Sequence, residues 1–220
     1  MNKMKKMDAE LIIWDLDGTL IDSKRDIAYA VNTTLARIDH PPLSNELIYE
    51  YVGNGVRPLI EKAVLATGGG NSLETAISHF QEIYLAHLLD TTVLFEGIAG
   101  VLEHFKGKKM AVASNKPYRY VEKILEGLGV ARYFVSVKGG DSVPEKKPHP
   151  LMLEEIMREA GAAPAEAVFI GDSAVDMQTG KNANVRTVGV IYGFRPESEI
   201  RESAPDIIVA APHELKGVIA

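Results

Sequence analysis

The sequence predicts an α/β fold, in which a doubly wound (Rossmann-like) parallel sheet forms a core with an inserted helical cap domain. Three observations support this prediction. Short apolar runs rich in β-branched residues recur along the 220 residues, helix-length stretches separate most of them, and one long helical block interrupts the alternation. Runs with little polar alternation are typical of strands covered on both faces. A composition of 46% hydrophobic and 25% charged residues fits a globular chain with a sizeable core.

The predicted strands coincide with the apolar runs. They are expected at Leu11–Trp14, Met110–Ala113, Tyr133–Val137, Ala167–Ile170, Thr187–Ile191 and Ile207–Val209. The helices between them are expected at Pro117–Leu128, Pro148–Ala160 and Ala174–Asn184. Because strand, helix and strand alternate, the connections should be right-handed crossovers within one parallel sheet.

A helical block of roughly 70 residues follows the first strand. Its helices are expected at Ile27–Ile38, Asn45–Tyr51, Val56–Ala66 and Leu73–Leu88. The block is too long for a crossover connection. We therefore predict a core domain of residues 1–21 plus 94–220 and a cap domain of residues 22–93. The two linkers, near 20–24 and 91–97, would lie side by side and form the hinge of a lid.

Composition and charge disfavour several classes of partner. The chain has 24 basic and 30 acidic residues, a net charge of −6, which gives no support to nucleic acid or an anionic membrane as a partner. Asp8 and Glu10 interrupt the segment that a signal peptide would need, and no run of about 18 apolar residues could span a bilayer. Without cysteine there is no disulfide framework and no thiolate site. We expect a cytoplasmic monomer or homodimer.

Two carboxylates follow the first predicted strand in the segment Asp15-Leu16-Asp17-Gly18-Thr19-Leu20. Ligands of open α/β sheets bind beyond the carboxyl ends of the strands. Residues two apart on an extended chain project to the same side, and Gly18 permits a tight turn behind them. The alternative is a solvated acidic turn that ends the strand.

Polar residues also follow later strands. Ser114 and Asn115 follow the second, Lys147 follows the third, and Asp172 and Asp176 follow the fourth. Taken singly, they have ordinary alternatives: a strand-ending turn for Ser114-Asn115, a surface lysine for Lys147, and a helix cap with a first-turn acid for Asp172 and Asp176.

Taken together, the strand ends deliver four carboxylates to one crevice, where they would repel one another without a cation. Oxygen ligands favour Mg²⁺, while the lysine and the hydroxyl suit phosphate oxygens. The set therefore predicts phosphoryl transfer.

These residues resemble the four motifs of the haloacid dehalogenase superfamily, and the resemblance covers essentially the whole chain. It implies that Asp15 is the nucleophile, that Asp17 is the general acid and base, and that Ser114 and Lys147 hold the phosphoryl oxygens. It also implies a Mg²⁺ site made by Asp15, the Asp17 backbone carbonyl and Asp172, with Asp176 as a ligand or as a neighbour that orients one. Dehalogenating members lack the second aspartate, so Asp17 favours a phosphate ester as substrate.

The segment Tyr51–Val56 is similar to the cap of phosphoglycolate phosphatases, a subgroup of that superfamily, and so are Ser114–Pro117 and the region 189–206. This likeness implies a small anionic substrate, with 2-phosphoglycolate as the leading prediction. The substrate-binding candidates are Gly18, Thr19, Asn54, Gly55, Arg57, Asn115 and Lys116. For Arg57 the alternative is a solvated helix residue beside Pro58.

Three other functions stay open. Two belong to the same superfamily: an inorganic pyrophosphatase, and a phosphosugar phosphatase or mutase. The third is a non-catalytic module that binds a phosphate ligand. The proton donor Asp17 argues against the last, because a module that only binds needs none.

Overall fold

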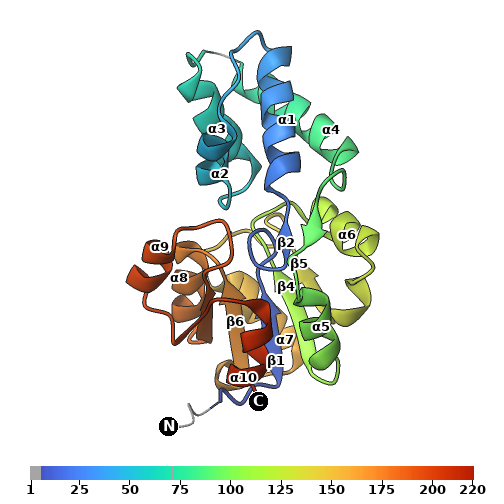
Figure 1. Ribbon diagram of the computed structural model, residues 1–220, viewed down its shortest axis with the longest axis vertical. Helices are drawn as coiled ribbons and strands as arrows, with labels where there is room; N and C mark the ends of the chain where they lie inside the picture. Colours follow the sequence, from blue (N-terminus) through green and yellow to red (C-terminus); the bar gives the residue numbers. More distant parts are fainter. Residues whose placement is uncertain (1–5, 71) are drawn as a thin grey trace.

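The computed structural model describes residues 6–70 and 72–220 as two lobes, a sheet flanked by helices and a smaller helical lobe above it (Figure 1). The first five residues of the predicted core segment 1–21 lie outside the described residues. Both ends of the described chain lie at the far end of the sheet lobe, where Met7 bridges to Ile219. The predicted α/β fold is confirmed.

The described residues of the larger lobe form a six-stranded parallel sheet in the order β5-β4-β1-β6-β7-β8. The strands are β1 (Leu11–Trp14), β4 (Lys109–Ala113), β5 (Ser136–Lys138), β6 (Ala167–Gly171), β7 (Arg186–Val190) and β8 (Ile207–Val209). The central strand β1 lies between β4 and β6, with Leu11 level with both Lys109 and Ala167. Because all pairs are parallel, every strand ends at the same edge of the sheet, and that edge faces the helical lobe (Figure 1).

Helices cover both faces of the sheet. They are α5 (Ile98–His104), α6 (Tyr118–Gly127), α7 (Leu151–Ala160), α8 (Ala174–Asn182), α9 (Glu197–Glu202) and α10 (Leu215–Val218). The fully buried strand β1 alternates between two apolar clusters, since Ile12 and Trp14 belong to one and Leu11 and Ile13 to the other. This double burial explains why the strand reads as an uninterrupted apolar run.

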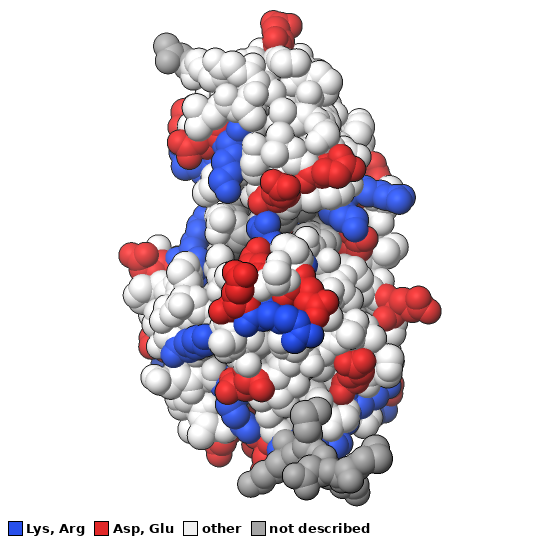
Figure 2. Space-filling model, turned by 60° about the vertical axis from the view of Figure 1, so that its left-hand side comes forward, with Lys and Arg blue, Asp and Glu red and all other residues white. Residues whose placement is uncertain are grey.

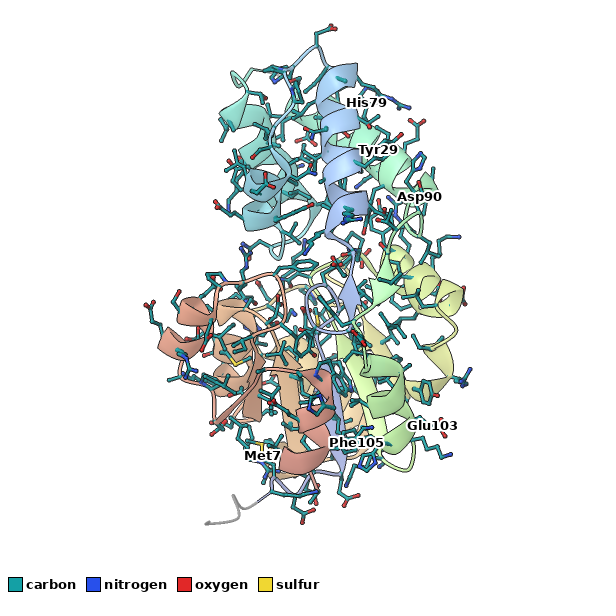
Figure 3. All side chains as sticks on the ribbon, viewed as in Figure 1. Met7, Tyr29, His79, Asp90, Glu103 and Phe105 are labelled. Atoms are coloured by element: carbon teal, nitrogen blue, oxygen red, sulfur yellow. The ribbon has the colours of Figure 1, made fainter. Side chains whose placement is uncertain are left out.

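The helical lobe lies between two short strands, β2 (Ile21–Asp22) and β3 (Val93–Leu94), which pair in antiparallel fashion. Its helices are α1 (Lys24–Arg37), α2 (Asn45–Tyr51), α3 (Val56–Ala66) and α4 (Leu73–Ala86). Side chains fill both lobes (Figure 3); Tyr29 and His79 belong to the helical lobe, and Met7 and Phe105 lie at the far end of the sheet lobe. We call this lobe the cap; that it folds as a separate domain of residues 22–93 stays a prediction.

One predicted strand, Tyr133–Val137, is wrong over most of its length. Residues Ala131–Tyr133 form a short 3-10 turn, and the strand begins only at Ser136. The turn is closed by hydrogen bonds from the Tyr133 and Phe134 amides to carbonyls three residues earlier. The apolar run therefore reflects packing of Tyr133 and Phe134 against the core at the sheet edge. Burial and strand geometry give the same pattern in so short a run.

The neck between the lobes is held by Asp26, a buried residue in the first turn of α1. Its carboxylate accepts hydrogen bonds from the backbone amides and the hydroxyls of both Thr91 and Thr92, at 2.6–3.0 Å. Burial raises the pKa of Asp26, but these hydrogen bonds outweigh burial and leave the pKa below its ordinary value of 3.8. The two linkers of the cap are thus joined by one side chain.

We predict that Asp26→Ala lowers the free energy of unfolding by about 2–4 kcal/mol, because four donors lose a buried, charged acceptor. The contribution of Asp26 should be complete above pH 3.8, its ordinary pKa, and should fade as the pH falls through the lower pKa of the folded state. Urea unfolding across a pH series measures both effects. The exposed neighbour Arg25 provides the control, since Arg25→Ala should change stability by less than about 0.5 kcal/mol. An Asp26→Ala protein as stable as wild type would contradict this role.

Candidate active site

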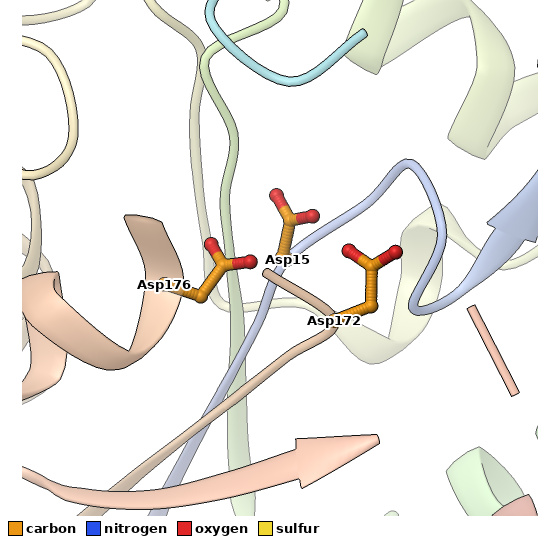
Figure 4. Close-up of side chains that lie close together, drawn as sticks. All are labelled: Asp15, Asp172 and Asp176. Carbon is orange, nitrogen blue, oxygen red and sulfur yellow. The ribbon is translucent and has the colours of Figure 1, made fainter. Parts of the chain in front are cut away.

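Three buried carboxylates meet where β1 and β6 end. Asp15 directly follows β1, Asp172 directly follows β6, and Asp176 lies in the first turn of α8. One carboxylate oxygen from each lies within 4.8 Å of the others. Figure 4 shows the three side chains close together, Asp15 from the chain that follows β1 and Asp172 and Asp176 from the chain that runs from β6 into α8. Hard oxygen ligands so close together fit a divalent cation.

The backbone explains how these groups come together. The amide of Asp15 continues the β1–β6 pairing by donating to the carbonyl of Ile170 at 2.9 Å. Gly171 then lets α8 approach, because a Cβ there would lie 2.3 Å from the Asp176 Cβ. The cap of α8 is Ser173, and Asp176 completes a capping box by accepting from the Ser173 amide at 3.1 Å. The helix-cap alternative is therefore correct in part: Asp176 supports the helix start, whereas Asp172 does not cap it.

Lys147 is the cation closest to this cluster. Its Nζ donates to Asp15 Oδ1 at 2.6 Å and to Asp176 Oδ1 at 2.7 Å, and the side chain is buried. Burial raises the pKa of Asp15 to about 7, although Lys147 lowers it in part, and burial likewise places the pKa of Asp172 well above its ordinary value. Burial opposes the charge on Lys147, but Asp15 and Asp176 more than offset this and raise its pKa. Lys147 pairs with two of the three carboxylates, so the cluster retains a net demand for positive charge.

Asp17 has different partners from Asp15. Lys116 Nζ donates to its two carboxylate oxygens at 2.7 and 2.8 Å, and the Ser23 hydroxyl donates to Oδ1. The Asp17 side chain is not part of the metal-competent cluster, and the metal role predicted for it concerned its backbone carbonyl. Asp15 and Asp17 thus line the same cavity, but their carboxylates have different charged partners.

The residues after β4 connect the site to the cap. Ser114 is buried and lines the cavity. The Asn115 side chain accepts from the Lys147 amide at 3.0 Å and donates to the Lys147 carbonyl at 3.2 Å. The same amide group donates to the carbonyl of Gly53 in the cap at 3.1 Å. Asn115 therefore fixes the backbone of Lys147 and also contacts the segment of residues 50–55, from the end of α2 to the start of α3, which we call the cap loop.

Gly18 and Thr19 shape the turn behind Asp17 and do not line the cavity. Gly18 has a φ of 85°, and a Cβ there would lie 2.1 Å from Asp172 Oδ2. Thr19 is fully buried, and its carbonyl accepts from the Tyr192 hydroxyl at 3.1 Å. Gly18 thus lets this turn lie against Asp172, Thr19 connects the turn to Tyr192, and neither residue lines the cavity.

The cavity lies between the two lobes. Figure 2 shows the surface hollowed there, with acidic and basic side chains gathered on both sides of the hollow. From the sheet lobe it is lined by the polar residues just described. The cap residues that line it are Ile27, Val52, Gly53, Gly55, Val56, Leu59, Phe80 and Tyr84. An anionic site on one side thus faces a largely apolar wall on the other.

Two of the predicted cap residues lie outside this lining. Gly55 lines the cavity, but Asn54 and Arg57 do not. Arg57 is exposed, and its guanidinium makes two hydrogen bonds of 2.8 Å to Glu74 on the outside of the cap. The substrate contact of Arg57 stays a prediction, and in this structure the start of α3 turns the side chain toward α4. The solvated alternative describes it better.

Arg195 and Tyr84 are among the cavity residues that the sequence did not indicate. Arg195 follows β7 and donates from Nη1 to the Glu50 carbonyl at 3.0 Å and from Nη2 to the Val52 carbonyl, so it clasps the cap loop. The sequence could have indicated Arg195, because ligands of open α/β sheets bind beyond the carboxyl ends of the strands and Arg195 follows β7. Tyr84 on α4 presents a buried hydroxyl, but in the sequence it is indistinguishable from an aromatic core residue.

None of the helices in the described residues is long and apolar enough to cross a membrane. The site offers buried carboxylates, a lysine and a set of oxygen ligands that could hold a divalent cation. This combination suits attack on a phosphoryl group.

The chain matches known proteins along most of its length. Residues 12–190 match the model of the haloacid dehalogenase-like hydrolases. The chain is 35% identical to a phosphoglycolate phosphatase of Vibrio parahaemolyticus, with 99% of both chains covered, and 38% identical to one of Psychrobacter arcticus, with 90% of both covered. A crystal structure of a predicted phosphoglycolate phosphatase from Haemophilus somnus superimposes with a TM-score of 0.91 at 30% identity, covering 97% of this chain and 98% of that one. The predicted resemblance is confirmed, and the chain belongs to the haloacid dehalogenase-like hydrolase family.

Proposed function

We propose that this chain is a Mg²⁺-dependent phosphatase that hydrolyses a small phosphate monoester, 2-phosphoglycolate, through an aspartyl-phosphate intermediate. The observation that carries the proposal is the convergence of Lys147 with the carboxylates of Asp15, Asp172 and Asp176 at one edge of the sheet. A carboxylate is a poor nucleophile toward an anion unless positive charge offsets the repulsion. Here Lys147 and a candidate cation site lie beside the carboxylate of Asp15.

In this proposal Asp15 attacks phosphorus, so that an oxygen–phosphorus bond forms while the ester bond breaks. Lys147 and the Ser114 hydroxyl hold the phosphoryl oxygens. Asp17 gives a proton to the departing oxygen and later takes one from the water that hydrolyses the aspartyl-phosphate. Mg²⁺ bound by Asp15, the Asp17 carbonyl and Asp172, beside Asp176, would offset the charge of the transferring group.

The substrate is proposed from two observations. The relatives named above carry the name phosphoglycolate phosphatase. The cap side of the cavity is largely apolar, with Val56, Leu59 and Phe80 among its lining residues. Such a wall offers few partners to the several hydroxyls of a sugar phosphate. It therefore favours a small leaving group over a sugar.

The remaining parts of the proposal concern the setting. The predicted location is the cytoplasm, the predicted state a monomer or homodimer, and nucleic acid and membranes are not expected as partners. Turnover of a panel of phosphate esters, tested beside the anhydride pyrophosphate, ranks the substrates by kcat/KM.

We predict that Asp15→Asn lowers kcat by on the order of 10³-fold or more, because an amide cannot form the phosphoryl-enzyme. Wild-type turnover should require added Mg²⁺ and stop with a chelator. Release of phosphate from p-nitrophenyl phosphate and 2-phosphoglycolate measures both effects. Asp8→Asn, at an exposed aspartate, is the matched control and should behave as wild type. Turnover that survives both Asp15→Asn and chelation would rule out the mechanism.

Asp17→Asn should keep Mg²⁺ binding, because the ligand proposed there is a backbone carbonyl. Its kcat should nevertheless fall by about 10²–10⁴-fold, the usual contribution of general acid–base catalysis. Calorimetric titration with Mg²⁺ and steady-state kinetics separate the two properties. Full activity in this variant would remove the acid–base role from Asp17.

Lys147→Met should slow phosphoryl transfer by about 10²–10³-fold, because it removes the charge that faces the phosphoryl oxygens. Inhibition by inorganic phosphate should weaken in parallel. Lys181→Met, at an exposed lysine on α8, is the control and should leave both quantities unchanged. If phosphate inhibition and turnover of Lys147→Met equalled those of wild type, Lys147 would not contact the substrate.

A further inference from the structure

Three basic residues line the cavity: Lys116, Lys147 and Arg195. The contacts of two of these residues already account for their presence in the cavity. Lys147 faces Asp15 and Asp176, and Arg195 clasps backbone carbonyls of the cap loop. Lys116 remains, and it lies on the side of Asp17, where the alcohol part of the substrate must leave in the proposed reaction.

Lys116 is buried at 7% exposure, and its Nζ lies between the two lobes. On one side it donates to both oxygens of Asp17, and on the other it lies 4.9 Å from the ring centre of Tyr84 on α4. An ammonium has three donor protons, so the two bonds to Asp17 leave one direction for a further acceptor. The cavity provides the space in which that acceptor can bind.

Tyr84 supplies a second donor at the same place. Its side chain is only 2% exposed and lines the cavity, yet its hydroxyl makes no hydrogen bond to any of the described residues. A buried hydroxyl without a partner is unfavourable, which makes it rare in a folded protein. Among the described cap residues that line the cavity, Tyr84 alone has a polar side chain. An acceptor on the ligand would satisfy it.

We propose that Lys116 and Tyr84 form a subsite for a carboxylate on the leaving group. The enzyme would then select phosphate esters of small hydroxy acids over esters of neutral alcohols. The inference rests on the proposed phosphatase function and deepens it by naming the residues that recognise the substrate class. A carboxylate accepts from both an ammonium and a phenol, and the adjacent apolar residues Ile27, Leu59 and Phe80 limit the size of the group that carries it.

The test compares two esters that differ in one group. In 2-hydroxyethyl phosphate a neutral hydroxymethyl group replaces the carboxylate of 2-phosphoglycolate. The ratio of their kcat/KM values is measured with the full chain and Mg²⁺ in wild type, Lys116→Met and Tyr84→Phe. Lys123→Met is the control, since Lys123 is an exposed lysine on α6 outside the cavity.

Wild type should prefer 2-phosphoglycolate by at least about 10-fold, and Lys116→Met should reduce this preference by about 10–100-fold, the usual effect of losing a hydrogen bond to a charged group. Tyr84→Phe should reduce it by about 3–10-fold. This variant keeps the ring that stacks on Phe80, so it provides the test if Lys116→Met does not fold. Lys123→Met should keep the wild-type ratio.

Equal turnover of the two esters by wild type would overturn the inference and leave the phosphatase function standing. The same holds if folded Lys116→Met and Tyr84→Phe lose activity toward both esters in equal proportion, because these residues would then serve Asp17 and the cap alone. If wild type hydrolyses neither these esters nor p-nitrophenyl phosphate, the proposed function fails and the inference fails with it.

Discussion

The burial of three like charges at one sheet edge is the constraint on which the rest of the structure depends. Asp15, Asp172 and Asp176 are each at most 7% exposed, and their oxygens lie within 4.8 Å of one another. Such an arrangement is unfavourable unless positive groups surround it. Lys147 supplies a full charge, and the amide of Phe194 donates to Asp172 at 2.7 Å. The negative charge that remains uncompensated favours the binding of a cation at this site.

The scaffold satisfies this constraint with backbone geometry. Parallel pairing of β1 with β6 brings Asp15 and Asp172 to the same level, and Gly18, Gly171 and Gly193 allow the segments to approach. A side chain at any of these glycines would collide with one of the aspartates or with the neighbouring backbone, at 2.1–2.5 Å. Asn115 then holds the Lys147 backbone from a neighbouring strand. Buried segments of the backbone thus fix the positions of the charged side chains.

The cap is attached to this rigid base in two ways. At the neck, Asp26 joins the two linkers through Thr91 and Thr92. At the cavity, Arg195 and Asn115 donate to carbonyls of the cap loop. The neck contacts lie within the cap and its linkers, whereas the cavity contacts cross between the lobes.

The sequence by itself determined the fold class, most of the strands and helices, and the residues that follow the strands, because hydrophobic periodicity and strand-end position are local properties. Asp15, Ser114, Lys147, Asp172 and Asp176 were identified in that way. Only the tertiary structure decided the partners: Lys116 with Asp17, Arg195 with the cap loop, and Arg57 with Glu74 away from the cavity. It also decided that Tyr133 belongs to a turn at the sheet edge. The physical reason is that burial and charge pairing depend on segments far apart in the chain, and a local pattern shows which side chains are apolar or charged without showing what they meet.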